Sequence, residues 1–182
     1  EIMKAPASIF WLLIIQTITI MASAKTEEQK YKVVQSEKDF EIRFYPSVTL
    51  ATVYSSAKSY RELSGNGFRT LAGYIFGGNG SDTKISMTSP VHMDINNSKS
   101  SMSFVMPSSY NTEHLTKPNN SDVKLEKTEE EYVAAIRFSG YASDTDIKSY
   151  SEKLRNLLNE KGIAYYGNFR FLGYNPPYQF FG

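Results

Sequence analysis

The side chains that most often carry chemistry are few in this chain. It contains two histidines, His92 and His114, and no cysteine, which excludes disulfides, thiolate metal sites and a cysteine nucleophile. Three successive acids, Glu129, Glu130 and Glu131, fall in a predicted hairpin tip, where such residues point in different directions and are solvated. General acid–base catalysis needs a positioned, partly desolvated pair, and none can be identified. The sequence therefore predicts that this protein is not an enzyme.

Neither the histidines nor the methionines are arranged like metal ligands. His92 shares the alternation of Lys84 and Asp94 in a predicted strand, and His114 falls in a polar connection, so we expect both on the surface. The methionines of this strand and the next share the apolar alternation, which indicates core packing rather than ligation. They are Met87, Met93, Met102 and Met106. No bound metal is predicted.

The composition is that of an ordinary globular domain. The chain has 182 residues, of which 41% are hydrophobic and 14% aromatic, and 20 Lys and Arg oppose 19 Asp and Glu. One domain fits this length, because hydrophobic cores stop growing only beyond about 250 residues. The net charge of +1 does not indicate the basic face that nucleic-acid binding needs. We therefore expect no nucleic-acid partner.

Residues 1–24 are predicted to be a signal peptide. A basic start at Met3-Lys4 precedes an apolar run at 9–21, and Ala22-Ser23-Ala24 follows as a small-residue cleavage site. A membrane span would need about 20 mostly apolar residues, and this run is shorter and contains polar residues. We expect cleavage after residue 24, secretion of residues 25–182 and no membrane anchor afterwards.

Three Asn-x-Ser sequons, at Asn79, Asn96 and Asn119, fall in predicted loops. Loops of a secreted chain tolerate N-glycosylation, so the sequons agree with secretion. Their support is weak, because a chain this rich in Ser, Thr and Asn contains such sequons by chance.

The first half of the domain has the predicted order strand, strand, helix, strand, strand. Alternating apolar residues predict the strands, and apolar residues at three- and four-residue spacing predict the helix. The expected elements are strands at 40–45 and 48–55, a helix from Ser59 to a stop at Gly77, and strands at 84–95 and 102–107. The interior Gly65 and Gly67 predict a kink or a late start of the helix, and Pro90 predicts an edge strand or a bulge.

The second half repeats this order with one strand missing. A polar connection leads to expected strands at 123–127 and 132–140, a helix capped by Ser143 and stopped by Gly162, and a strand at 164–173. The predicted fold class is α+β, with antiparallel, β-barrel-like sheets built from two β-β-α-β-β pseudo-repeats and two helices packed outside. We expect the last strand of the second repeat to be absent from this sequence.

Six short motifs carry a family resemblance through their order and spacing. They are Phe40-Glu-Ile-Arg-x-Tyr45, Gly67-Phe-Arg-x-Leu-x-x-Tyr-Ile-Phe-Gly77, Lys84-Ile-x-Met-Thr-x-Pro-Val91, Ser103-Phe-Val-Met-Pro107, Phe138-Ser-Gly140 and Gly173-Tyr-Asn-Pro-Pro177. Together they resemble the SOUL haem-binding protein family over residues 31–182. Members of that family continue with a further strand, so the resemblance also implies that residues 25–182 are a SOUL domain without its last strand.

The resemblance implies a reversible binder of haem or another tetrapyrrole, with a shallow apolar cleft beside the first helix and the Pro-Pro loop. Haem is a flat, mostly apolar plate with two propionates, so it needs apolar walls and cationic groups at one rim. The implied walls are Phe68, Leu71, Ala72, Ile75, Tyr174, Pro176, Pro177 and Tyr178, and the implied propionate partners are Lys58, Arg61 and Arg69. Without the resemblance, apolar residues at helical spacing would be assigned to core packing. We expect no strong axial ligand, unless a tyrosine supplies one.

Two functions from different classes stay open. The first is a secreted carrier or buffer of haem or another tetrapyrrole. The second is a protein-interaction or signalling domain that uses the same apolar surface, since some SOUL-like proteins are implicated in signalling. A hydrolase is a third and weaker alternative, because distant relatives of this fold include hydrolases while no catalytic set is visible here.

Overall fold

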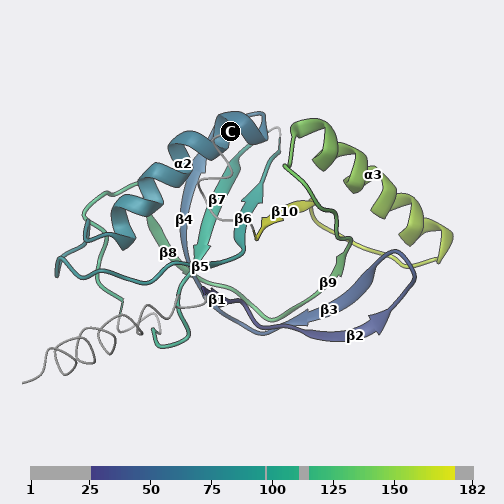
Figure 1. Ribbon diagram of the computed structural model, residues 1–182, viewed down its shortest axis with the longest axis horizontal. Helices are drawn as coiled ribbons and strands as arrows, with labels where there is room; N and C mark the ends of the chain where they lie inside the picture. Colours follow the sequence, from purple (N-terminus) through teal and green to yellow (C-terminus); the bar gives the residue numbers. More distant parts are fainter. Residues whose placement is uncertain (1–25, 97, 111–114, 175–182) are drawn as a thin grey trace, which may run out of the picture.

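Two helices and three β-sheets make up the described part of the protein (Figure 1). A computed structural model describes residues 26–96, 98–110 and 115–174. In chain order the elements are β1 (Glu27–Glu28), β2 (Lys32–Ser36), β3 (Glu41–Tyr45), β4 (Thr49–Ser55), α2 (Tyr60–Ile75), β5 (Thr88–Ser89), β6 (Val91–Asp94), β7 (Ser100–Val105), β8 (Lys124–Lys127), β9 (Glu131–Ala135), α3 (Asp144–Glu160) and β10 (Arg170–Gly173).

The strands pair antiparallel, apart from one short parallel pair. The larger sheet has the order β10-β6-β7-β4-β8 and the smaller one the order β2-β3-β9, while β1 pairs in parallel with β5. The predicted α+β fold with two helices and antiparallel sheets is therefore confirmed. The described strands do not close into a barrel, so the barrel-like curvature and the two pseudo-repeats stay predictions.

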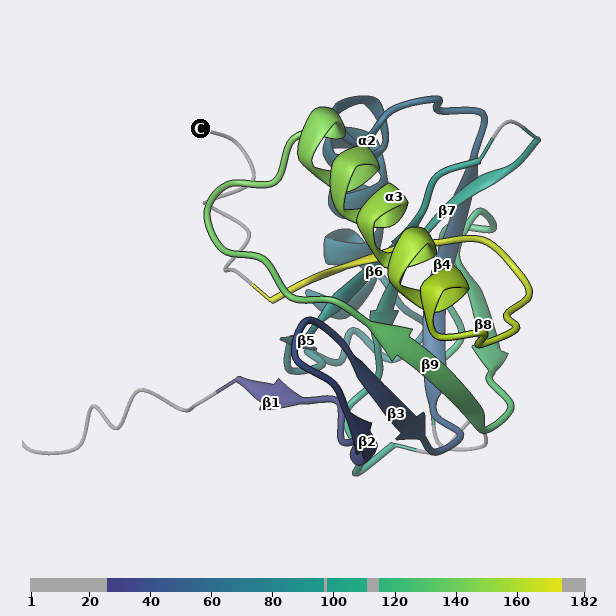
Figure 2. The same ribbon diagram turned by 90° about the vertical axis from the view of Figure 1, so that its right-hand side faces the viewer.

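Each helix covers a different sheet (Figures 1 and 2). α2 packs on β4 and β7, which lie inside the five-stranded sheet. α3 packs with Leu154 and Leu158 against Phe40 and against Ile42 of β3 in the three-stranded sheet. The molecule thus has two hydrophobic clusters, one beneath each helix.

α2 begins where its sequence predicts. The Ser59 hydroxyl accepts a hydrogen bond from the backbone N–H of Glu62 at 3.1 Å, which satisfies one donor of the first turn. The helix is unbroken through Gly65 and Gly67, so the expected late start is wrong. A Cβ on Gly67 would lie 3.3 Å from the Cβ of Met102 in β7. Glycine at this position therefore lets the helix approach the sheet closely.

α3 also follows its sequence signals. The Ser143 hydroxyl accepts from the backbone N–H of Asp146 at 3.1 Å, and the Asp146 carboxylate accepts from the Ser143 backbone N–H at 3.2 Å, which completes a capping box. Gly162 follows the helix with a φ of +66°, a conformation that favours glycine.

The predicted strand at 84–95 is interrupted at Pro90. Proline has no backbone N–H for a ladder, and the chain is divided there into β5 and β6. β6 is not an edge strand, because it pairs with β10 on one side and β7 on the other. The surface position expected for His92 is also wrong, since only 8% of its area is exposed. Gln29, which follows β1, covers it and contacts its ring nitrogen.

Neither described helix is both long and apolar enough to span a bilayer.

Candidate ligand-binding surface

The solvent-facing side of α2 carries several residues with small side chains, flanked by arginines. The buried side of the helix is formed by Tyr60, Leu63, Ser64, Gly67, Leu71, Tyr74 and Ile75. Opposite these residues, at helical spacing, lie Arg61, Gly65, Phe68, Arg69, Ala72, Gly73 and Phe76, which we call the α2 face. A Cβ on Gly65 or Gly73 would meet nothing within 4 Å, so both positions face open space.

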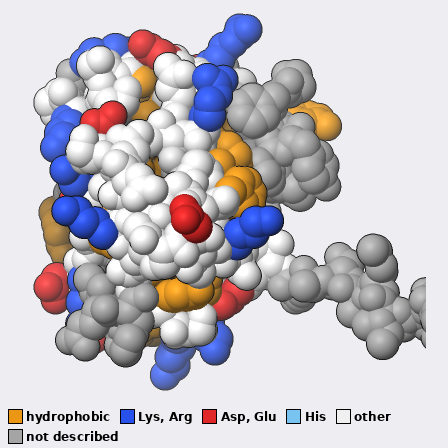
Figure 3. Space-filling model, turned by 90° about the vertical axis from the view of Figure 1, so that its left-hand side faces the viewer, with side chains coloured by type: hydrophobic (Ala, Val, Ile, Leu, Met, Phe, Trp, Pro, Cys, Tyr) orange, Lys and Arg blue, Asp and Glu red, His pale blue; other side chains and the backbone are white. Residues whose placement is uncertain are grey.

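The α2 face ends at an exposed aromatic side chain. Phe76, directly after the helix, has 64% of its area exposed. Figure 3 views the side of the molecule on which α2 ends and shows a strip of hydrophobic side chains between Lys and Arg side chains. This side of the protein therefore combines apolar contact area with positive charge.

The four helical residues implied as a haem wall divide into two pairs. Phe68 and Ala72 are half-buried, and the Phe68 ring lies 5.2 Å from the ring of Phe104 in β7. Leu71 and Ile75 are 0% and 1% exposed and belong to the core beneath the helix. A ligand on the outside of the helix would touch the first pair, and the second pair would support it from behind. Ligand contact stays a prediction for all four residues.

The three implied propionate partners are exposed and close in sequence. Lys58 lies two residues before the helix, and its backbone N–H donates to the Glu62 carboxylate at 2.8 Å. Arg61 and Arg69 lie in α2, and neither forms an ion pair with another described residue. The structure thus leaves the two guanidinium groups accessible to an anion in solvent.

The second implied wall is only partly described. Pro176, Pro177 and Tyr178 lie outside the described residues, whereas Tyr174 is described and directly follows β10. Tyr174 lies beside Tyr45 of β3, and partial burial raises the pKa of the Tyr174 hydroxyl. The structure therefore holds the start of the Pro-Pro segment against the three-stranded sheet.

Tyr174, itself 41% exposed, lies beside a buried cation that sequence reasoning missed. Arg43 is 3% exposed, its Nε donates to the Glu41 carboxylate at 2.8 Å, and its guanidinium carbon lies 4.4 Å from the centre of the Tyr31 ring. One guanidinium nitrogen also donates to the Tyr45 hydroxyl at 3.4 Å, while the other terminal nitrogen has no partner among the described residues.

Burial lowers the pKa of Arg43, but hydrogen bonds to Tyr45 and Glu41 outweigh it, so the pKa is raised and the group stays charged. The alternation of β3 placed Arg43 on a polar face, and nothing in the local sequence indicates that Tyr31 and Tyr174 cover it.

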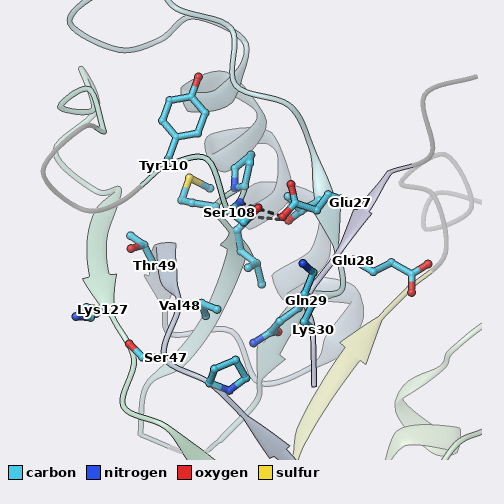
Figure 4. A pocket seen from close by; sticks show the side chains of 15 residues that line it. Glu27, Glu28, Gln29, Lys30, Ser47, Val48, Thr49, Ser108, Tyr110 and Lys127 are labelled. Atoms are coloured by element: carbon cyan, nitrogen blue, oxygen red, sulfur yellow. Dashed lines mark hydrogen bonds between the residues drawn. The ribbon is translucent and has the colours of Figure 1, made fainter. Parts of the chain in front are cut away.

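A separate pocket of about 730 Å³ lies at the other end of the five-stranded sheet (Figure 4). It is lined by residues 27–30 around β1, by the turn at 46–49, by residues 105–108, and by Thr88, Tyr110 and Lys127. No residue of α2 or β10 lines it. The Glu27 carboxylate accepts from the Ser108 backbone N–H at 2.9 Å, which holds β1 against the pocket rim.

The buried polar groups of this pocket are already used within the fold. Gln29 accepts a hydrogen bond from the His92 ring at 2.7 Å, and the Thr88 hydroxyl donates to the Val105 carbonyl at 2.5 Å. Because a ligand is oriented by convergent free polar groups, this pocket offers less specificity than its volume suggests.

His92 is buried beneath Gln29 and therefore has no access to a bound metal ion. Burial, with a smaller effect of Arg170, lowers the pKa of His92 to about 3, so the ring is neutral near neutral pH. An amide oxygen only accepts, so Nε2 carries the proton donated to Gln29. His114 lies outside the described residues. Within residues 26–96, 98–110 and 115–174, no group of three His, Cys, Asp or Glu could hold a metal ion.

Comparisons with known proteins place the chain in a family. A family model described as SOUL heme-binding protein matches residues 26–182. Heme-binding protein 1 of Xenopus laevis is 27% identical over 175 residues, which cover 90% of each chain. Heme-binding protein 2 of Mus musculus is 28% identical over 148 residues, which cover 77% of this chain and 72% of the mouse protein. Similarity thus extends over nearly all of the described residues.

Proposed function

The chain belongs to the SOUL heme-binding protein family, and on this premise we propose that it binds haem or another tetrapyrrole reversibly at the α2 face. The family match over residues 26–182 is the observation that carries the proposal. The relatives named above are haem-binding proteins by name, which favours a binding role over a catalytic one. The ligand is cargo, and the protein supplies a surface that takes it up and releases it.

The shape of the α2 face suits a flat macrocycle. Gly65, Ala72 and Gly73 keep the helix surface low, so a planar ring can approach the backbone, while Phe68 and Phe76 offer aromatic contact. Such a ring buries apolar area against this surface, which is worth roughly 25 cal/mol per Å².

The charges of the α2 face suit the two propionates. Arg61 and Arg69 have no ion-pair partner among the described residues, and a guanidinium forms two parallel hydrogen bonds with a carboxylate. Lys58, close to the first turn of the helix, adds a third positive charge. These groups would orient the ligand with its carboxylates towards solvent and its ring across the helix.

The Pro-Pro segment supplies the second wall in this proposal. Tyr174, the residue that precedes this segment in the sequence, lies beside Tyr45 of the three-stranded sheet. Two consecutive prolines restrict the backbone of the segment, which lowers the entropy lost when it contacts a ligand. We expect no strong protein ligand to the iron, because the one described histidine, His92, is 8% exposed and lies in β6 of the five-stranded sheet, not on the α2 face.

Secretion is a further part of the proposal. The predicted signal peptide ends at residue 24, and the family match begins at residue 26, so the domain and the leader occupy separate segments. A secreted carrier or buffer would meet free tetrapyrrole outside the cell.

Hemin titration monitored by the Soret band tests the ligand and the surface together. Arg69→Glu should weaken hemin binding by about tenfold, because a guanidinium–propionate pair worth roughly 1.5 kcal/mol becomes a repulsion. Lys127→Glu is the matched control, since it makes the same change of charge at the rim of the separate pocket. Binding that falls in Lys127→Glu and not in Arg69→Glu would move the site to the pocket.

A second pair of variants tests the apolar contact. Gly73→Glu fills open space on the α2 face and should abolish saturable binding, whereas Gly80→Glu, in the loop after the helix, should leave it unchanged. Circular dichroism reports whether each variant is folded. Hemin that fails to saturate the unmodified protein would contradict the proposal and favour the alternative, a protein-interaction or signalling domain that presents the same surface to a partner chain.

A further inference from the structure

The three sequon asparagines differ in burial and in the hydrogen bonds of their side-chain amides. Asn79 is 1% exposed, and its Nδ2 donates to the Tyr74 carbonyl at 3.0 Å and to the Thr83 carbonyl at 2.7 Å. Its Oδ1 accepts from the backbone N–H groups of Ser81 and Thr83 at 3.3 and 3.1 Å. Asn79 therefore closes the loop after α2 and has no hydrogen on Nδ2 to spare.

Asn96 is also engaged through both ends of its amide, but it is less buried than Asn79. It is half-buried, and its Nδ2 donates to the Lys99 carbonyl at 2.8 Å and to the Asp94 carboxylate at 3.3 Å. Its Oδ1 accepts from the hydroxyl of Ser98, the serine of its own sequon, at 2.9 Å. Attachment of a sugar to Nδ2 would cost this turn at least one hydrogen bond.

Asn119 differs from both. Its backbone N–H donates to the Gly78 carbonyl at 3.1 Å, which fixes the main chain, while its side chain is exposed and forms no hydrogen bond within the described residues. The neighbouring turn is held without it, because Asn120 accepts from the backbone N–H of Asp122 at 2.8 Å. A substituent on Asn119 therefore breaks no contact of the fold.

We propose that Asn119 is the N-glycosylation site of this protein once the chain enters a secretory pathway. The inference rests on the secretion part of the proposed function. The co-reactant is an oligosaccharide joined to a lipid pyrophosphate. A bond forms between Asn119 Nδ2 and C1 of the first sugar, the bond between C1 and the pyrophosphate oxygen breaks, and the lipid pyrophosphate leaves with that electron pair. Nδ2 loses one proton, so the product is a neutral N-linked amide.

The same geometry argues against a glycan on Asn79. A sugar on Nδ2 would remove one of the hydrogen bonds that this nitrogen donates. The side chain is also only 1% exposed, so the packed residues around it leave no room for a sugar. Sugars are added to chains that are still unfolded, and only the chains whose sugar the folded structure can accommodate go on to fold. A chain glycosylated on Asn79 does not reach this fold, and the secreted, folded population carries sugar on Asn119.

Expression of the full chain in cultured eukaryotic cells tests the inference. The secreted protein is treated with a peptide N-glycosidase in ¹⁸O water, and tryptic peptides are searched for the conversion of Asn to ¹⁸O-labelled Asp. We expect the label on Asn119 and an electrophoretic shift equal to one glycan. Asn119→Gln and Ser121→Ala should each abolish the shift, and Asn96→Gln, the matched control in an unmodified sequon, should leave it unchanged.

A second chain, with residues 1–24 replaced by a known secretory leader, separates the two proposals. If only this chain is secreted and labelled on Asn119, secretion by the native leader fails and the glycosylation site stands. A glycan on Asn79 or Asn96 of the folded protein, or an unmodified Asn119 in the chain with the known leader, would overturn the inference.

Discussion

The protein has two layers, each formed by a sheet and the helix that covers it. The α2 layer buries more side chains than the α3 layer. Beneath α2, Leu63, Leu71, Tyr74 and Ile75 are at most 2% exposed, and β4 and β7 each have a paired strand on both sides. Beneath α3 only Leu154, Leu158 and Phe40 are buried, and the outer strand β9 has one partner among the described strands and no buried residue. The wider sheet beneath α2 therefore accompanies the larger set of buried side chains.

The layers also differ in the polar group that each buries. The five-stranded sheet holds a neutral His92, and the three-stranded sheet holds a charged Arg43. Burial disfavours the charged form of both groups, but Arg43 has a carboxylate, a hydroxyl and an aromatic ring beside it, whereas His92 has an amide oxygen. Arg43 stays charged because a guanidinium is strongly basic and has partners for its charge, whereas burial keeps the weakly basic His92 neutral.

The largest expected effect is on the α2 layer. Leu71→Ala should lower the free energy of unfolding by about 4 kcal/mol, because it leaves a cavity in a fully packed site. Leu154→Ala in α3 should cost about 2 kcal/mol, since the half-buried residues around it can relax into the space. Urea denaturation monitored by circular dichroism measures both values. Equal losses would show that the two layers are packed alike.

The second-largest expected effect is the loss of stability when Arg43, the buried cation of the three-stranded sheet, is replaced. Arg43→Ala should cost about 3 kcal/mol, because it removes the shorter of the two ion pairs of Glu41 and the packing of Tyr45 and Tyr174. Arg43→Met keeps most of the volume and should cost less than Arg43→Ala in the same denaturation experiment. If both variants were as stable as the unmodified protein, the cluster would not contribute to the stability of this layer.

The buried imidazole should make the five-stranded layer sensitive to acid. The pKa of His92 is about 3 in the folded protein and about 6.5 when unfolded, so the unfolded state binds the extra proton first. The neutral His92 side chain therefore does not disfavour the folded state above pH 6.5. As the pH falls below 6.5, protonation of the unfolded state lowers the free energy of unfolding. The free energy of unfolding should fall by about 2 kcal/mol between pH 7.5 and 5.

The two histidines provide a matched pair for this measurement. His92→Gln should flatten the dependence of unfolding free energy on pH, and His114→Gln should preserve it. The Soret band of bound hemin should change little in either variant, because neither histidine is expected to ligate the iron. A steep pH dependence that survives His92→Gln would assign the effect to another group.

The smallest expected effect compares two glycines within α2. Gly65→Ala should raise the free energy of unfolding by up to about 1 kcal/mol, because a methyl group there meets open space and the unfolded chain loses freedom. Gly67→Ala should not raise the free energy of unfolding, because the added Cβ would lie only 3.3 Å from the Cβ of Met102. Thermal unfolding of both variants tests this, and equal stabilisation would mean that the sheet tolerates the added methyl group.

Much of the fold followed from local patterns. The capping serines Ser59 and Ser143 and the spacing of the apolar residues predicted both helices, because these signals act within one turn of the chain. Six motifs sufficed to predict the family, which the match over residues 26–182 shows. The α2 face could be named in part from the sequence, since helical spacing alone separates Arg61 and Arg69 from the buried side.

Other features depend on residues that are distant along the chain. The burial of Arg43 needs Tyr31 and Tyr174, and that of His92 needs Gln29. The alternation of a strand predicts two faces, but it cannot indicate which segment covers each face. The role of Gly67 likewise depends on Met102, which lies in a strand beyond the helix.

The sequence by itself determined the helices, most of the strands, the family and the set of candidate cations. Only the tertiary structure decided that Leu71 and Ile75 support the α2 face from behind, that Tyr174 is anchored beside Arg43, and that one sequon is free of the fold. The physical reason is that secondary structure and caps depend on neighbours in the chain, whereas burial depends on which distant segments exclude water from a side chain.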